Sequence, residues 1–144
     1  MDITIRPIEP IDYPAVLALW REVIGNKNVT GENIAPYYAK EKLDDNHMTF
    51  VAVADGQTVG FATVVQAMSI GMEVGYLKLN GIAVLPAWQN KGIGSQLLAH
   101  VEQYAQSRGL SSVGLATGFQ RKDAHRFYER HGYKTGSFAY FKNF

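Results

Sequence analysis

The sequence predicts an α/β (α+β) fold in which helices cover both faces of a mixed central sheet. Strand-like and helix-like periodicities alternate along the chain in the order β-α-α-β-β-β-α-β-α-β. The length of 144 residues suits one domain. No linker rich in Pro, Gly or Ser interrupts the chain. We therefore expect residues 1–144 to form a single domain.

The first third of the chain predicts one strand and two helices. Residues 3–8 alternate between apolar and polar side chains, as a strand does. Asp12 stands where it can cap a helix with one apolar stripe, and Gly25-Asn26 provides its end. A shorter helix is expected over residues 34–43, with Pro36 near its start.

A hairpin and a third strand follow. Residues 48–54 and 59–66 are β-branched and apolar, and Asp55-Gly56 between them favours the positive φ angles of a tight turn. The next strand is expected over residues 76–85, where Pro86 stops it.

The last third predicts two helices, each followed by a strand. The first helix ends at Gly109, and a short buried strand over residues 112–117 comes next. Asp123 is positioned to cap the second helix, which ends at Gly132. A final strand is expected over residues 137–141.

Composition excludes several classes of protein. Fourteen Lys and Arg against 13 Asp and Glu give a net charge of +1, so no nucleic-acid or membrane partner is expected. The absence of cysteine removes disulfides, thiolate nucleophiles and cysteine-based metal sites, and no His, Asp or Glu spacing predicts a metal. The amino terminus lacks the pattern of a signal peptide, and no apolar run is long enough to span a bilayer. We expect a cytoplasmic protein.

The segment Gln89-Asn90-Lys91-Gly92-Ile93-Gly94 joins a strand to the start of a helix. A helix start offers unpaired N–H groups and a positive dipole end, which bind phosphate, and glycines allow close approach. The alternative is that the glycines only make a tight turn. A P-loop would need Gly-Lys-Ser/Thr, which is absent. A dinucleotide-binding loop would need a small residue where Leu97 stands, so a nucleotide-dependent oxidoreductase is disfavoured.

This loop resembles the acyl-CoA-binding signature of the GNAT superfamily of N-acetyltransferases, Gln/Arg-x-x-Gly-x-Gly/Ala. About thirty residues later, the segment from Ala124 to Tyr133 is similar to the second signature of that family, Ala-x-x-Phe-Tyr-x-x-x-Gly-Phe/Tyr. Because both motifs occur in the right order, the chain is identified as a member of this superfamily over essentially its whole length. The resemblance implies a single GNAT-type domain.

The resemblance also implies acetyl-CoA as co-substrate and no metal. Main-chain N–H groups of the glycine loop would hold the diphosphate, and the preceding strand would run beside the pantetheine arm. The side chains of that strand indicate only core packing. The implied cofactor-binding residues are Ile82, Ala83, Val84, Gln89, Asn90, Lys91, Gly92, Ile93, Gly94 and Ser95.

The chemistry is expected to be direct attack of an amine on acetyl-CoA in a ternary complex, because the chain has no cysteine to carry the acetyl group. By resemblance, Tyr128 is the general acid that protonates the leaving thiolate; the alternative is an aromatic side chain that only packs. Many relatives place a glutamate on the strand before the loop, but residues 78–81 contain no carboxylate. Glu73 and Glu32 remain as candidate bases.

The resemblance places residues 26–38 over the acyl end of the cofactor. Glu32, Tyr37 and Tyr38 are then candidates for the acceptor pocket, although the tyrosines are equally suited to packing under the helix. The acceptor is expected to be a primary amine of a small molecule, or of a peptide or protein. The alternative function is a non-catalytic acyl-CoA sensor. By resemblance, a homodimer is also expected, with residues 138–141 as a candidate contact.

Overall fold

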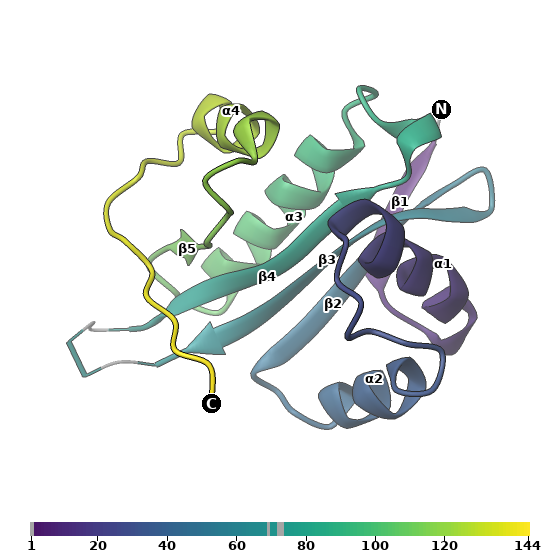
Figure 1. Cartoon of the computed structure of the whole chain (residues 1–144), viewed down its shortest axis with the longest axis horizontal. Helices are drawn as coiled ribbons and strands as arrows, with labels where there is room; N and C mark the ends of the chain where they lie inside the picture. Colours follow the sequence, from purple (N-terminus) through teal and green to yellow (C-terminus); the bar gives the residue numbers. More distant parts are fainter. Residues whose placement is uncertain (1, 69, 72–73) are drawn as a thin grey trace. The chain divides into compact units, whose positions relative to one another are not determined.

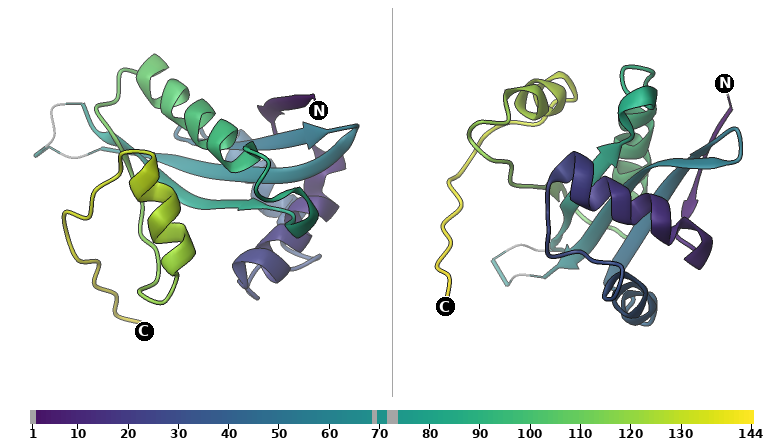
Figure 2. Two further views of the ribbon diagram at one scale, coloured as in Figure 1. Left: turned by 90° about the horizontal axis from the view of Figure 1, so that it is seen from above. Right: turned by 45° about the vertical axis from the view of Figure 1, so that its right-hand side comes forward.

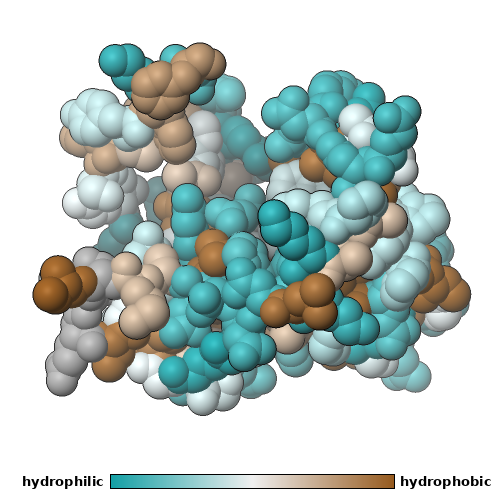
Figure 3. Space-filling model, turned by 90° about the horizontal axis from the view of Figure 1, so that it is seen from below, coloured by the Kyte–Doolittle hydropathy of each residue, from teal (hydrophilic) through white to brown (hydrophobic). Residues whose placement is uncertain are grey.

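The computed structural model describes residues 2–68, 70–71 and 74–144. Contacts divide the chain into two compact units, residues 1–114 and residues 115–144. Within the described residues, none of the helices has the length and apolar character that crossing a membrane requires. One face of the surface is mainly hydrophilic, with apolar residues scattered over it rather than gathered into one patch (Figure 3).

The first unit is built on a five-stranded sheet with the order β1-β2-β3-β4-β5 (Figure 1). Neighbouring strands are antiparallel from β1 to β4, whereas β5 is parallel to β4, so the sheet is mixed as expected. The strands are β1 (Ile3–Pro7), β2 (His47–Ala54), β3 (Gln57–Ala67), β4 (Tyr76–Val84) and β5 (Val113–Gly114).

Helices cover both faces of this sheet, which confirms the predicted layering (Figure 2, left). On one face lie α1 (Tyr13–Ala18), which continues as π-helical turns over Leu19–Ile24, and α2 (Ile34–Lys42). On the other face lies α3 (Ile93–Ser107). Strand β2 shows the alternation: Val51 packs in the core cluster under α1 and α2, whereas the ring of Phe50 contacts His100 of α3.

The turn between β2 and β3 has the predicted conformation. Asp55 has a φ of 51° and Gly56 a φ of 76°, which are the left-handed angles of a two-residue hairpin turn. The adjacent strands begin and end within two residues of the expected limits.

Asp12 precedes the first helix, but its side chain does not cap it, so that part of the prediction was wrong. The carboxylate is fully buried and accepts hydrogen bonds from both Nη atoms of Arg6 at 2.7 and 3.0 Å. It also accepts from Thr58 Oγ1 at 2.7 Å and from the Glu9 N–H at 2.8 Å. A cap is less needed because Pro14, in the first turn of α1, has no N–H. Asp12 instead ties β1 to β3.

The second unit contains α4 (Lys122–Arg130), which ends before Gly132 as predicted. Asp123 does not cap this helix: it lies inside the first turn and pairs with Arg126, and Arg121 occupies the cap position. The ring of Phe127 contacts those of Tyr128 and His131 at centroid distances of 5.3 and 4.6 Å. These contacts form the apolar side of α4.

Two predicted strands differ from the structure. The expected strand over residues 112–117 is reduced to Val113–Gly114. Residues 137–141 form no strand, so that expectation was wrong, and Phe138, Tyr140 and Phe141 are exposed. Alternating apolar residues alone do not form a strand without a neighbour.

Candidate active site

The glycine loop gives α3 an open amino-terminal end. Asn90 and Gly92 have left-handed φ angles of 60° and 83°, which turn the chain from β4 into the helix. The Gly92 carbonyl accepts the first helical hydrogen bond, from the Gln96 N–H at 3.1 Å, and no side chain caps the helix start. A Cβ atom on Gly92 would meet nothing within 4 Å. The space beside Gly92, directly before the first helical turn, is therefore open, and the main-chain N–H groups of such a turn are the groups that bind phosphate.

The strand before the loop presents main-chain groups at its outer edge. The Leu85 N–H donates to Val59 O on β3 at 2.8 Å, and residues of an antiparallel strand alternate in the direction of these groups. Ile82 and Val84 thus direct their N–H and C=O away from β3. Consistently, Val84 O accepts a 2.9 Å hydrogen bond from Gln89 Nε2. Ala83 has the opposite direction, and its side chain is buried.

Little of this edge is covered by β5. Among the described residues, β5 pairs with β4 only at Leu77 and Lys78. The edge around Ile82 and Val84 therefore makes no ladder with β5, and an extended ligand can run beside it as an added strand.

A bulge bends β4 at the stretch that lacks the family's usual glutamate. Thr63 on β3 faces Gly81, whereas the next residue, Val64, faces Leu79, so Asn80 is the extra residue. Asn80 and Lys78 are exposed. The bulge thus turns polar side chains outward at the middle of the strand.

The ring of Trp20 lies over Gly81, the residue that directly follows the bulge. A Cβ atom on Gly81 would lie 2.8 Å from Cη2 of Trp20, so any other residue at this position would force the ring to move. Trp20 Nε1 donates to the Tyr38 hydroxyl at 3.0 Å. Tyr38 is buried, and this burial raises the pKa of its phenol, whereas 54% of Tyr37 is exposed. Of the two tyrosines, Tyr37 is the accessible one.

Of the two glutamates suggested as bases, only Glu32 lies among the described residues. Glu32 lies exposed in the turn before α2. Glu73 lies outside the described residues. No three His, Asp or Glu side chains among the described residues are grouped as metal ligands would be.

Tyr128 lies half-buried on α4 in the second unit. Burial raises the pKa of its phenol, and the Arg121 guanidinium opposes this in part. The side chain is therefore protonated at neutral pH, the form that a general acid requires.

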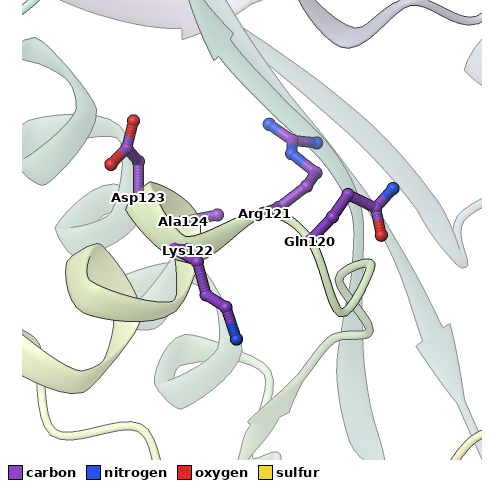
Figure 4. A pocket seen from close by; sticks show the side chains of 5 residues that line it. All are labelled: Gln120, Arg121, Lys122, Asp123 and Ala124. Atoms are coloured by element: carbon purple, nitrogen blue, oxygen red, sulfur yellow. The ribbon is translucent and has the colours of Figure 1, made fainter.

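A polar pocket of about 250 Å³ lies at the start of α4. Its side chains spread apart rather than converging on one point (Figure 4). It is lined by Gln120, Arg121, Lys122, Asp123 and Ala124. This arrangement presents charge but no catalytic constellation.

Sequence reasoning missed one buried carboxyl. Glu41 on α2 is only 6% exposed and accepts a hydrogen bond from Thr49 Oγ1 at 2.7 Å. The signal was present in the helix periodicity, because Ile34, Tyr38 and Glu41 are spaced i, i+4 and i+7 and all face the core. Counting Glu41 as a member of that stripe would have predicted its burial.

Comparison with known proteins shows which family has this fold and these motifs. A model of the acetyltransferase (GNAT) family matches residues 16–133. The chain belongs to the GNAT acetyltransferase family. An aminoalkylphosphonate N-acetyltransferase of Salmonella typhimurium is 32% identical over 131 residues, which cover 91% of this chain and 84% of that protein. An aminoglycoside N(6')-acetyltransferase type 1 of Stenotrophomonas maltophilia is 30% identical, covering 96% of this chain and 92% of that protein.

A solved structure titled as a transcriptional regulator from Bacillus halodurans C-125 has a TM-score of 0.90 and 26% identity to this GNAT chain. The match covers 99% of this chain and 100% of that one. Together with the family match and the N-acetyltransferase relatives, these findings make the chain an acyl-CoA-dependent N-acetyltransferase that transfers an acetyl group to an amine. A purely sensory role is not favoured.

Replacing Gly92 of this acetyltransferase with Ala is expected to weaken acetyl-CoA binding at least about tenfold. The new Cβ atom would stand in the open space before the helix start, and the left-handed φ adds about 1 kcal/mol of strain. Binding is measured by calorimetry. Gly109→Ala is the matched control, since Gly109 follows the other end of α3 with a φ of +73° and the same open surroundings. Equal affinities in the two variants would contradict phosphate binding at the loop.

Proposed function

We propose that this acetyltransferase acetylates the primary amine of a small molecule that also carries an anionic group, such as an aminoalkylphosphonate. The observation that carries the proposal is Lys78, an exposed cation two residues before the bulge at Asn80. Lys78 pairs with Val65 and therefore shares the sheet face of Thr63 and Trp20. A phosphonate or carboxylate held by this ammonium would bring an amine of the same molecule close to the bulge.

The same lysine opposes a polycationic acceptor. A fixed positive charge repels an aminoglycoside, which carries several ammonium groups, and attracts an acid. Aminoglycosides remain the second candidate because of the Stenotrophomonas relative. The name of the Salmonella relative agrees with the anionic class.

In the proposed reaction, the neutral amine attacks the thioester carbonyl carbon of acetyl-CoA. A main-chain N–H of the Ile82–Leu85 stretch stabilises the oxyanion. The carbon–sulfur bond then breaks, and the Tyr128 hydroxyl gives its proton to the leaving CoA thiolate. The acetyl group passes directly from CoA to the amine, because the chain contains no cysteine to hold it.

The test compares two acceptors that differ only in the acid: an aminoalkylphosphonate and the alkylamine of the same chain length. We expect kcat/KM to be higher for the phosphonate by about 10–100-fold, the range of one charge-assisted hydrogen bond. Lys78→Gln should remove most of this preference, and Lys78→Glu should reverse it. Lys134→Glu makes the same charge change at an exposed position of the second unit and should leave it intact. A preference that survives Lys78→Glu would refute the assignment.

We also propose that residues 1–144 act as one cytoplasmic domain that forms a homodimer. The family match over residues 16–133 spans both units, which supports the single domain. The exposed rings of Phe138, Tyr140 and Phe141 supply apolar surface for a dimer. A monomer mass that does not change with concentration in light scattering would exclude the dimer.

A further inference from the structure

A chain of buried polar side chains leads from α2 to the middle of the sheet. Glu41 Oε1 accepts a hydrogen bond from Thr49 Oγ1 at 2.7 Å, and Thr49 Oγ1 lies 2.7 Å from Thr63 Oγ1. All three side chains are buried, with exposures of 6%, 1% and 7%. The second carboxyl oxygen of Glu41, Oε2, is buried and has no hydrogen-bond partner among the described residues. Leaving one oxygen of a buried carboxyl without a hydrogen bond lowers the stability of the fold. Such a group calls for an explanation, and a functional role is one.

The hydrogen bonds of this chain run in one direction. A threonine hydroxyl has a single proton, and Thr49 gives its proton to Glu41. The short contact between the threonines therefore requires Thr63 to donate to Thr49. Thr63 Oγ1 can then accept a hydrogen bond from a further donor. The end of this hydrogen-bonded series nearest β4 is therefore a proton acceptor.

That end lies beside the bulge. Thr63 faces Gly81 across the β3–β4 ladder, and Asn80 is the bulged residue next to it. The exposed side chain of Lys78, proposed above to hold the acid of the acceptor, belongs to the same face. This is also the part of β4 where residues 78–81 carry no carboxylate.

We propose that Glu41 is the positioning residue that receives the proton of the acceptor amine through Thr63 and Thr49, in place of a glutamate on β4. The proposal rests on the proposed acetyl transfer to an amine. An N–H bond of the ammonium breaks and leaves its electron pair on nitrogen. The proton passes to Thr63 Oγ1, the Thr63 proton passes to Thr49 Oγ1, and the Thr49 proton passes to Glu41 Oε1. The carboxylate becomes a carboxylic acid, and the amine becomes nucleophilic.

The surroundings of Glu41 suit a proton acceptor. Burial raises the pKa of the carboxyl, while the Thr49 hydrogen bond and the nearby His47 on β2 lower it and Asp44 raises it. The charge of Glu41 also acts on the phenols of Tyr37 and Tyr38, which lie on the same helix. The net effect is a pKa above the usual value of 4.5, which moves the carboxyl toward the working pH of a general base.

The test is the pH profile of kcat/KM for Glu41→Gln with the best amine acceptor. At pH 7 we expect a loss of about 10²–10³-fold. The loss should shrink as the pH approaches the acceptor's own pKa of about 10, where the amine loses its proton without help. Thr63→Val should show the same pH-dependent loss, and Thr63→Ser should restore activity because the hydroxyl returns. Glu22→Gln, at an exposed glutamate of the same helical layer, should leave both rate and profile unchanged.

A purely structural role gives a different result. It would lower activity by one factor at every pH, or would leave Thr63→Ser as impaired as Thr63→Val, and either result overturns the proposal. Parental activity in both Glu41→Gln and Thr63→Val overturns it as well, while leaving the proposed function intact. Failure of the parent to acetylate any amine overturns the proposed function and the proton path with it. Thr63→Val keeps the test available if Glu41→Gln does not fold.

Discussion

Replacing Tyr128 with Phe is expected to lower kcat about 10²–10⁴-fold while changing KM for both substrates little. This is the usual contribution of a general acid that acts in the transition state. Burial raises the pKa of the Tyr128 phenol, with partial opposition from Arg121, so the proton is present throughout the neutral range. Phenylalanine keeps the ring contacts with Phe127 and Tyr133 but has no proton to give. Initial rates of CoA release measure the effect.

The matched control is Tyr140→Phe, which removes the same hydroxyl from a tyrosine of the same unit that is 90% exposed. It should retain the parental rate. If Tyr128→Phe also stays within about threefold of the parent, Tyr128 is only a packing residue, and another group protonates the thiolate.

The largest loss of stability is expected from Asp12→Ala, at about 2–4 kcal/mol of unfolding free energy. The substitution leaves the guanidinium of Arg6, the hydroxyl of Thr58 and the N–H of Glu9 without their shared acceptor. Breaking a buried pair by removing one partner costs about 3–5 kcal/mol, and the 30% exposure of Arg6 reduces this because water reaches it. Urea unfolding measures the difference. Asp55→Asn, in the exposed hairpin turn, should change stability by less than about 0.5 kcal/mol.

The contribution of Asp12 to the stability of the fold should be lost as the pH falls. Burial alone would raise the pKa of this carboxyl, but the hydrogen bonds from Arg6, Thr58 and Glu9 hold it below its usual value of 3.8. A lowered folded-state pKa stabilises the protein above the unfolded value, and this stability disappears as the pH falls through the folded value. The difference in unfolding free energy between the parent and Asp12→Ala should therefore be constant from about pH 5 to 8 and should disappear below about pH 4. A gap that persists at about pH 2 would show that packing, not charge, is lost.

Local sequence was sufficient wherever an element depends on its own residues. The hairpin around Asp55-Gly56 and the amphipathic helix α3 were expected within two residues of their observed limits. The glycine loop was recognised because Gln89, Gly92 and Gly94 match the Gln/Arg-x-x-Gly-x-Gly/Ala signature at the start of a helix. The family resemblance then predicted the fold, and the family model, which matches residues 16–133, agrees with it.

Elements that depend on distant partners were not predictable in this way. Asp12 does not cap its helix but joins Arg6 to Thr58, a residue of β3 that lies 46 positions further along the chain. The segment 137–141 has the alternation of a strand but no ladder partner among the described residues. The hydrogen bond between Trp20 and Tyr38 joins residues 18 positions apart, and local sequence does not specify it. Glu41 was overlooked because charged residues are rarely buried.

Acetyl transfer to a small anionic amine is tested most directly by measuring CoA release from acetyl-CoA across a set of amines. The set should contain an aminoalkylphosphonate, its matched alkylamine, an aminoglycoside and a peptide amine. We expect release that requires an amine, yields the N-acetyl product in equal amount and is fastest with the phosphonate. Tight acetyl-CoA binding without release on any amine would contradict the account and indicate an acyl-CoA sensor.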